Sequence, residues 1–358
     1  MALAQRLGAR GLGQCWPNPS VGCVLVRAGR VIGRGWTQPG GRPHAETVAL
    51  TQAGAAARGA TAYVTLEPCA HHGRTPPCAD ALVAAGVARV VVPFADPDPR
   101  VDGAGLARLR QAGIEVTEGI GTEAARDQHA GFLRRLREGR PQVTLKLAAS
   151  LDGRIATATG ESQWITGPAA RRMVHAMRMR HDAVLVGAGT ARADDPSLTV
   201  RGLGPVRQPV RAVASRHLDL PLDGTLGRTA RDVPVWLLHG GDAPADRVAA
   251  WQALGARSLP VAVAGGRDLP APALLAALGA AGMTRVLCEG GGALAASLLA
   301  ADLVDDLVWF TGGAALGAEG RPALGAMGLE RLASAPRFAL AATRAVGGDT
   351  VQHWRRAG

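Results

Sequence analysis

The hydrophobic and polar positions of residues 1–138 switch repeatedly between two periods. Strand-like runs occur at 21–26, 30–36, 62–66, 88–93 and 114–120, and helix-like periodicity occurs at 2–12, 43–54, 78–86, 105–113 and 122–138. Strands that alternate with helices are typical of helices packed over a mixed sheet. The pattern therefore predicts an α/β domain in this part of the chain.

A polar and basic stretch, LRRLREGRPQVTL at 133–145, interrupts this alternation. Gly139 and Pro141 end the preceding helix, because glycine favours a helix terminus and proline cannot continue a helix. A chain of 358 residues is also long for a single domain. We expect two domains, at 1–139 and at 140–358.

The second part repeats the alternation and adds two glycine-rich turns. Strands are predicted at 143–156, 210–215 and 234–240, helices at 170–180, 244–254 and 271–281, and strand–turn–helix units at 182–192 and 284–300. The turns GAGTAR (187–192) and EGGG (289–292) each open a helix, where bare backbone amides favour an anion. One such turn is an ordinary connection, but two on neighbouring strands favour a nucleotide cofactor.

Composition and charge narrow the range of partners. Aromatic residues make up only 3% of the chain, which argues against a stacking platform for single-stranded nucleic acid. The net charge of +11 is spread evenly, since residues 1–140 hold 17 arginines against 11 acidic residues and residues 141–358 hold 23 basic against 18 acidic residues. Nucleic-acid binding calls for a localised basic stripe. We expect a small phosphorylated molecule as partner and no nucleic acid.

Membrane and secretory signals are not evident either. No signal-like apolar core and no run of about 18 apolar residues occurs, so we expect no membrane association. Five cysteines are too few, and odd in number, for a disulfide scaffold. We expect a reduced, cytoplasmic protein that forms a homo-oligomer.

Lysine and asparagine each occur only once in the chain. Lys146 is the single lysine among 40 basic residues, and Asn18 is the single asparagine. A chain that uses arginine wherever any cation suffices keeps lysine where a compact ammonium is needed, although chance also produces such counts. We treat both as candidate site residues. The lysine count excludes a Walker-type loop, because that motif needs GK[ST] and Lys146 lies in TLKLA.

The strongest chemical signal lies between residues 44 and 78. His44, Cys69 and Cys78 offer one imidazole and two thiols, and Glu46 follows the histidine by two positions. Three protein ligands leave one position of a tetrahedral zinc open for water, and a nearby carboxylate can move the protons of that water. His44 and Cys78 are predicted at helix starts, where the partial positive charge favours thiolate over thiol.

A closed, structural zinc site is the alternative, with His71 or His72 as the fourth ligand. The HxE element at 44–46 favours the open, catalytic form, because zinc deaminases place a carboxylate in this way. The spacing of the ligands alone does not decide between the two forms.

The HAE and PC motifs resemble the cytidine-deaminase superfamily, whose members usually show two residues between the cysteines. Here eight residues, AHHGRTPP, separate Cys69 from Cys78. This enlarged loop, together with PNPSVG at 17–22, resembles the deaminase half of the bifunctional riboflavin-biosynthesis deaminase/reductases. The resemblance implies that His44, Cys69 and Cys78 bind zinc, that Glu46 is the proton shuttle, and that Asn18 contacts the edge of a pyrimidine. Candidates for the substrate phosphate are His72, Gly73, Arg74 and Thr75.

The second half resembles the reductase domain of the same family, which has a dihydrofolate-reductase-like fold. The matching stretches are KLAASLDGRIA, GESQWITG, RMRHDAVLVGAGTARADDPSLTVR, and CEGGGALAASLL with LVDDLV. The resemblance implies an NADPH site lined by Ala148, Trp164, Thr190, Asp194 and Gly291. It implies substrate contacts from Ser162, Arg178, Leu198, Arg201 and Glu289, with Lys146 near a ribose hydroxyl or phosphate.

The chain departs from this family pattern at two places. Ser215–Arg216 replaces the usual aspartate–serine pair after a strand, so Arg216 is a candidate contact for a 2′-phosphate. TGGAALG at 311–317 replaces a segment that usually contains a proline.

The resemblance implies a cytidine-deaminase-like zinc domain followed by a dihydrofolate-reductase-like domain. It also implies two successive reactions. The first is zinc-dependent hydrolytic deamination of a 2,5-diamino-6-ribosylamino-4(3H)-pyrimidinone 5′-phosphate. The second is NADPH-dependent reduction of the ribosyl group to a ribityl chain. Two alternatives stay open: a nucleobase or tRNA deaminase with an appended nucleotide-binding domain, and a nucleotide-binding regulator without chemistry.

Overall fold

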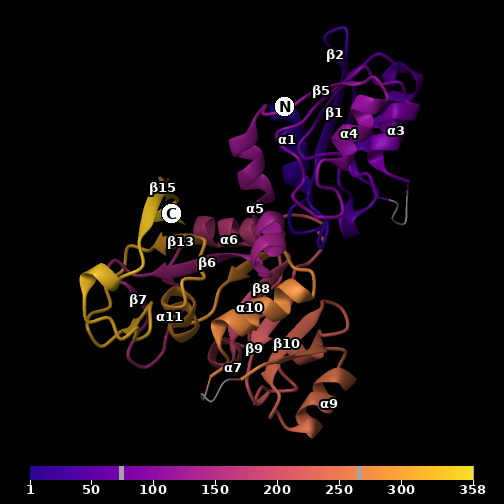
Figure 1. The fold of residues 1–358 in the computed structure, drawn as a ribbon. Coiled ribbons are helices and arrows are strands. Elements are labelled where there is room, and N and C mark those ends of the chain that lie inside the picture. Colours follow the sequence, from indigo (N-terminus) through magenta and orange to yellow (C-terminus); the bar gives the residue numbers. More distant parts are fainter. Residues whose placement is uncertain (72–75, 264–267, 358) are drawn as a thin grey trace. The chain divides into compact units, whose positions relative to one another are not determined.

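The computed structural model describes residues 1–71, 76–263 and 268–357 (Figure 1). The chain divides into two compact units, Met1–Gly139 and Arg140–Gly358. Each unit has its own sheet and its own helices, so the predicted α/β architecture is confirmed in both parts of the chain. None of the helices within the described ranges is long and apolar enough to cross a bilayer.

The first unit is built on a five-stranded sheet in the order β2-β1-β3-β4-β5. β1 pairs antiparallel with β2 and β3, whereas β3, β4 and β5 run parallel. The strands are β1 (Gly22–Arg27), β2 (Arg30–Trp36), β3 (Thr61–Val64), β4 (Arg89–Val91) and β5 (Glu115–Thr117), and the helices are α1 (Ala2–Gly8), α2 (Ala45–Ala53), α3 (Cys78–Ala84), α4 (Ala104–Gln111) and α5 (Thr122–Glu138). Leu25, Val64, Leu82 and Phe132 belong to its apolar core.

The helix ends in this unit follow from local chemistry. α5 keeps its predicted bounds and ends at Gly139, whose φ of 68° is a conformation that glycine adopts without steric cost. α2 begins two residues later than the sequence pattern predicts. His44 is its N-cap, with an extended backbone (φ −71°, ψ 161°), and Glu46 lies in its first turn. His44 therefore lies just before the helix rather than within it.

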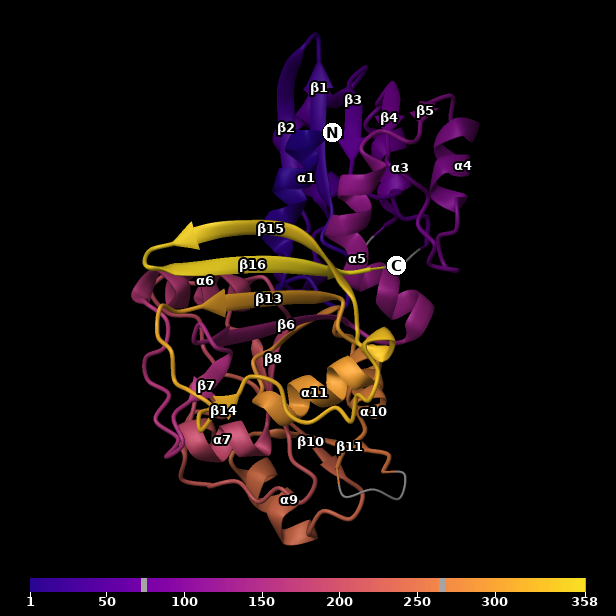
Figure 2. The same cartoon turned by 90° about the vertical axis from the view of Figure 1, so that its left-hand side faces the viewer.

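The second unit is built on a nine-stranded sheet in the order β11-β10-β9-β8-β12-β6-β13-β16-β15. The strands from β11 to β13 run parallel, and β16 and β15 add to them antiparallel, as Figure 2 shows for β6, β13, β16 and β15. The strands are β6 (Gln142–Ala149), β8 (Ala183–Gly187), β9 (Val210–Ala214), β10 (Val235–Gly240), β11 (Arg257–Val261), β12 (Arg285–Cys288), β13 (Asp306–Thr311), β15 (Phe338–Val346) and β16 (Asp349–Arg356), while β7 (Arg154–Ala156) and β14 (Arg321–Pro322) form a separate pair. The helices are α6 (Pro168–Met179), α7 (Ala188–Asp194), α8 (Thr225–Arg228), α9 (Ala245–Ala253), α10 (Ala271–Ala280) and α11 (Gly292–Ala300).

Burial explains which of these strands the sequence pattern predicts. β10 is buried along its whole length and β8 along nearly all of it, so their sequences VWLLHG and AVLVG are mostly apolar runs, as expected for parallel strands covered on both faces. β15 is exposed at all but its two terminal residues, and its sequence FALAATRAV has no regular alternation. The hydrophobic pattern accordingly does not predict the β15–β16 hairpin.

Candidate active sites

Two glycines of β2 bring helix α2 close to the sheet of the first unit. A Cβ atom on Gly33 would lie 2.3 Å from the carbonyl oxygen of Ala49, and one on Gly35 would lie 2.1 Å from that of Ala45. A larger side chain at either position would push the helix away, because protein interiors leave no spare volume. These alternate glycines therefore set the position of the α2 N-terminus, where the HAE motif lies.

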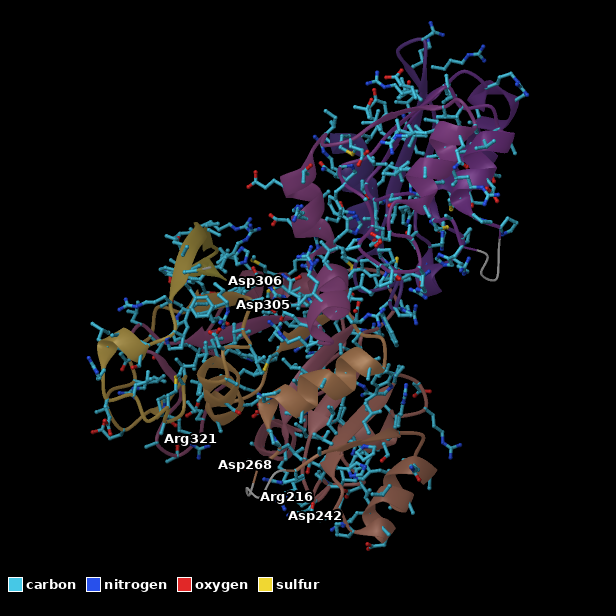
Figure 3. The ribbon with its side chains drawn as sticks, viewed as in Figure 1. Arg216, Asp242, Asp268, Asp305, Asp306 and Arg321 are labelled. Atoms are coloured by element: carbon cyan, nitrogen blue, oxygen red, sulfur yellow. The ribbon has the colours of Figure 1, made fainter. Side chains whose placement is uncertain are left out.

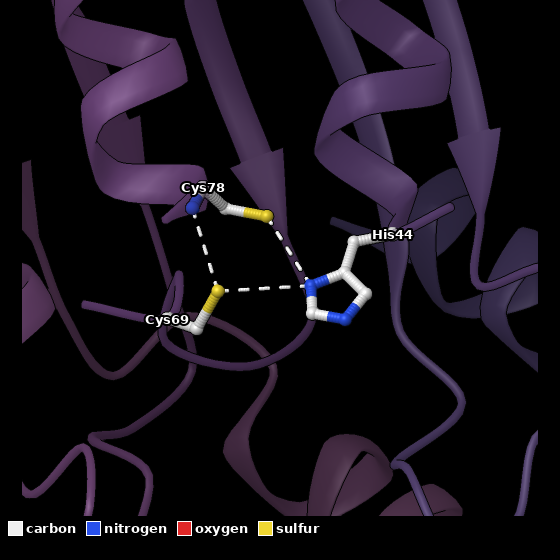
Figure 4. A group of neighbouring side chains, drawn as sticks. All are labelled: His44, Cys69 and Cys78. Atoms are coloured by element: carbon white, nitrogen blue, oxygen red, sulfur yellow. Dashed lines mark hydrogen bonds between the residues drawn. The ribbon is translucent and has the colours of Figure 1, made fainter. Parts of the chain in front are cut away.

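His44, Cys69 and Cys78 come together at this point (Figure 4). The Nδ1 atom of His44 lies 3.6 Å from the sulfur of Cys69 and 3.3 Å from the sulfur of Cys78. The possible ligand atoms of the three residues all lie within 4.8 Å of one another. Cys78 is the first residue of α3, and its backbone N–H donates to the sulfur of Cys69 at 3.4 Å. Two helix N-termini and the loop after β3 thus assemble the set.

The pKa values of His44, Cys69 and Cys78 are shifted in different directions. The hydrogen bond from the Cys78 side chain lowers the pKa of Cys69 to about 4, and the imidazole of His44 adds to the effect. The bond with Cys69 raises the pKa of His44, and the pKa of Cys78 is raised by its bond with Cys69 and by burial. The negative charge is therefore held on Cys69, and a stabilised thiolate is the form that binds a metal ion.

Glu46 lies in the first turn of α2 and is only 3% exposed. Burial raises the pKa of its carboxyl to about 7, although the charge of His44 and, less strongly, a hydrogen bond with Cys78 oppose this rise. A buried carboxyl group beside the ligand set can accept a proton and return it.

A cavity of about 130 Å³ adjoins these residues. Its lining includes Asn18, His44, Glu46, Cys69, His71, Asp96, Asp98 and Arg100. The amide nitrogen of Asn18 donates to the carbonyl oxygen of Gly41 at 3.0 Å and lies 3.5 Å from Nε2 of His44. Asn18 thus lies beside the ligand set. The predicted phosphate contacts, His72, Gly73, Arg74 and Thr75, fall outside the described residues.

The donor set fits a zinc ion. One imidazole nitrogen and two thiols are ligands that zinc prefers in tetrahedral sites. Among the residues that the structure describes, no further histidine, cysteine or carboxylate joins His44, Cys69 and Cys78. His71 lines the same cavity without belonging to the set. His72, the other candidate for a fourth ligand, lies outside the described residues. With the three described ligands alone, a tetrahedral zinc would keep one position for a water or substrate atom.

In the second unit, the two glycine-rich turns meet. They follow β8 and β12, which are neighbours in the sheet as predicted. The backbone N–H of Gly291 donates to Oγ1 of Thr190 at 3.0 Å, so the turns are joined directly. A Cβ atom on Gly292, the first residue of α11, would lie only 3.0 Å from the backbone nitrogen of Gly325. The close approach of these backbones favours glycine at this turn.

Two cavities of about 740 and 690 Å³ open beside these turns and share several lining residues. Each lies within the usual range for small-molecule sites, roughly 300–1,000 Å³. Arg216, the candidate contact for a 2′-phosphate, is not among the residues that line them. The other predicted cofactor and substrate contacts of this half all lie on their walls: Lys146, Ala148, Ser162, Trp164, Arg178, Thr190, Asp194, Leu198, Arg201, Glu289 and Gly291.

Arg178, Glu289 and Lys146 form a charged cluster in these cavities. The guanidinium of Arg178 donates twice to Glu289, from Nε at 2.6 Å and from Nη2 at 2.9 Å. Burial alone would raise the pKa of Glu289, but the ion pair with Arg178 outweighs it and the net shift is downward. Burial lowers the pKa of Lys146, against the attraction of Glu289. Glu289 therefore stays ionised, while Lys146 releases its proton more readily than an exposed lysine.

The sequence does not single out Arg171, His175 or Arg321, although all three line these cavities. The guanidinium of Arg171 lies 4.4 Å from the ring centroid of Trp164. Residues 171, 175 and 178 follow each other at helical spacing on α6, so Arg178 already indicated the face on which they lie. Arg321, labelled in Figure 3, comes from β14 and has no comparable signal.

Both departures from the family pattern have local partners. Nη2 of Arg216 pairs with the carboxylate of Asp242 at 2.7 Å, so a bound phosphate would compete with that carboxylate (Figure 3). The TGGAALG segment is held by Asp152, which accepts hydrogen bonds from the backbone N–H groups of Leu316 at 3.0 Å and Gly317 at 2.7 Å.

Comparisons with known families match both units. The family described as the RibD C-terminal domain matches residues 141–352. The family described as the cytidine and deoxycytidylate deaminase zinc-binding region matches residues 1–93. The two matches follow one another along the chain in the order that the sequence motifs predict.

Individual relatives align along nearly the whole chain. The riboflavin biosynthesis protein RibD of Escherichia coli is 44% identical, over 99% of this chain and 97% of its own length. That of Haemophilus influenzae is 42% identical, over 98% and 94%. A solved structure of Acinetobacter baumannii RibD superposes with a TM-score of 0.89 at 40% identity, covering 100% of this chain and 98% of that one.

A Thermotoga maritima structure is similar too. It is described as a diaminohydroxyphosphoribosylaminopyrimidine deaminase/5-amino-6-(5-phosphoribosylamino)uracil reductase, and it superposes with a TM-score of 0.86 at 33% identity over 100% of this chain and 97% of that one. The chain therefore belongs to the RibD family of riboflavin biosynthesis, bifunctional enzymes that join a zinc-binding deaminase domain to an NADPH-dependent reductase domain.

Proposed function

We propose that the two reactions are divided between the two units, with deamination in residues 1–139 and reduction in residues 140–358. The ligand set and Glu46 belong to the first unit, and the two larger cavities belong to the second. The substrate is the phosphorylated diaminopyrimidine after which the Thermotoga relative is named. A tRNA deaminase with an appended domain gains no support, because the RibD relatives align across both units.

In the first unit, His44, Cys69 and Cys78 would hold the zinc ion. Zinc supplies a Lewis acid that makes water nucleophilic at neutral pH. Deamination replaces the exocyclic amine of the pyrimidine by an oxygen from water and releases ammonia. Glu46 takes the two protons of the attacking water in turn, and delivers the first to the ring nitrogen and the second to the departing amine. Asn18, beside His44, offers its amide to the edge of the ring.

The observation that carries this assignment is a buried Glu46 in the same cavity as the three clustered ligands. Glu46→Gln keeps the shape of the side chain but cannot cycle a proton, so deaminase kcat should fall by about 10²-fold or more. Zinc content and reduction of the deaminated intermediate should be unchanged. Glu123→Gln, at an exposed position of α5, is the matched control. Deamination by Glu46→Gln at near the parental rate would show that Glu46 is not the proton shuttle.

In the second unit, NADPH supplies the hydride that reduces the ribosyl carbon. We assign Ala148, Trp164, Thr190, Asp194 and Gly291 to the cofactor, and Ser162, Arg178, Leu198, Arg201 and Glu289 to the substrate. Opening the sugar requires a proton at its ring oxygen. Lys146 is better suited than Glu289 to donate it, because both carboxylate oxygens of Glu289 already accept hydrogen bonds from Arg178.

We further propose that the protein is a homo-oligomer associated along β15. This nine-residue strand lies at the edge of the sheet, and Leu340 within it is 53% exposed. An unpaired edge strand offers backbone hydrogen bonds to a second copy. A cytoplasmic location suits the thiols of Cys69 and Cys78, which must stay reduced to bind metal.

A further inference from the structure

Glu67 lies two residues before Cys69, is only 4% exposed, and has no part in the chemistry assigned above. Its carboxylate accepts four backbone hydrogen bonds. The donors are the N–H groups of Asp96 at 2.8 Å, Gly103 at 3.1 Å, Gly105 at 2.8 Å and Leu106 at 3.2 Å. A carboxylate has about four acceptor positions, so these bonds use its whole capacity and leave none for a substrate.

The four donors all belong to residues 96–106, the segment between β4 and the first turn of α4, which we call the pocket wall. Asp96, Asp98 and Arg100 of the pocket wall line the deaminase cavity. The wall is ordered internally, since Oδ1 of Asp96 accepts a hydrogen bond from the backbone of Asp98 at 3.0 Å, and Asp98 pairs with Nε of Arg100 at 2.9 Å. Glu67 binds this segment near both of its ends.

Helix α4 receives no side-chain hydrogen bond from its own N-cap residue. Its N-cap residue is Gly103, which carries no side chain to accept the first free N–H groups. Glu67 supplies that acceptor from the loop that carries Cys69, and a carboxylate is the favoured charge at a helix N-terminus. The contact is also tight, because a Cβ atom on Gly105 would lie 2.0 Å from the carbonyl oxygen of Pro68.

We propose that Glu67 is a positioning residue for deamination, which sets the place of the substrate-facing pocket wall relative to the metal-binding loop. The two segments follow different strands, β3 and β4, and Glu67 ties one to the other only two residues from Cys69. This inference rests on the proposed function, because it takes Cys69 as a zinc ligand and the cavity as the deaminase site.

The test uses the full chain and the variant Glu67→Gln. Glutamine has one acceptor oxygen and turns an NH₂ group toward the remaining N–H donors, so part of the wall loses its anchor. The KM for the diaminopyrimidine should rise by about tenfold or more, with a smaller change in kcat. Hydrogen exchange should quicken across residues 96–106 but not across α3. Zinc content and reductase activity should match the parent, which shows that the chain is folded.

Gly105→Ala is the second variant. It leaves the carboxylate of Glu67 intact but forces α4 away from Pro68, so a positioning role predicts the same rise in KM and the same faster exchange. The Gly105→Ala variant also tests the positioning role if Glu67→Gln loses zinc or does not fold. Parental KM and parental exchange in either variant would overturn the proposal. The proposal would also be overturned if the pH profile of deaminase kcat changed in Glu67→Gln but not in Gly105→Ala, because Glu67 would then move protons. An active Glu46→Gln enzyme, by contrast, would refute the proposed function and not the role of Glu67.

Discussion

Lys146 on β6 lines both cavities of the second unit, close to the ion pair of Arg178 and Glu289. Its pKa is lowered by burial. An arginine in its place would keep the positive charge, but a guanidinium does not release its proton near neutral pH and needs more room. In the proposed role of proton donor, an arginine at position 146 would not serve the same chemistry.

Replacing Lys146 by arginine tests this at the residue scale. We expect Lys146→Arg to lower reductase kcat by about 10²-fold, because the proton donor is lost while the charge remains. Binding of NADP⁺, measured by calorimetry, should change little. Deamination by the same protein serves as the internal control. Reductase turnover near the parental value would mean that the single lysine is a coincidence of composition.

At the scale of elements, the hydrophobic pattern predicts a helix or strand only where burial leaves a mark on the sequence. An element with one buried face shows a period, and a strand buried on both faces shows an apolar run. α5 is predicted from its helical period, and β8 and β10 are predicted from their apolar runs. β15 is held by pairing with β16, in a register that joins Phe338 to Arg356 and Val346 to Asp349. Backbone pairing of an exposed strand leaves no hydrophobic period, so the hairpin could not be predicted from the pattern.

The exposed edge of β15 gives an element-scale prediction. Leu340→Lys places a charge on the edge strand and should shift the protein toward monomer, because a buried and unpaired ammonium would be costly at an interface. Sedimentation velocity measures the change in mass. Leu332→Lys is the matched control, since Leu332 is 78% exposed and lies in the short helix Leu332–Ser334 outside the strand. A mass unchanged by Leu340→Lys would contradict association along β15.

At the scale of the whole molecule, each unit contains the residues of one proposed site. The set of His44, Cys69 and Cys78 falls in Met1–Gly139, whereas the walls of both larger cavities come entirely from Arg140–Gly358. A change in the metal should therefore act on one reaction alone.

Removal of zinc with a chelator should abolish deamination and leave the kcat and KM of NADPH oxidation with the deaminated substrate unchanged. Restoring zinc should restore deamination in the parent but not in Glu46→Gln. In one sample, metal analysis measures the zinc content of the first unit, and the absorbance of NADPH measures reduction by the second. Parallel loss of both activities would contradict the division of the reactions between the units.

The sequence by itself determined the chemistry of this protein. Its signals are local patterns: the HAE motif, the two cysteines with the eight residues between them, and the two glycine-rich turns. Residue type and spacing are enough to recognise each of them. The tertiary structure alone decided which side chains and helices contact one another around the two sites. Three contacts depend on which elements pack together. They are the four backbone donors to Glu67, the pairing of Arg178 with Glu289 across 111 positions, and the close fit of α2 on the glycines of β2. Such contacts join residues far apart in the chain, and no local period encodes them.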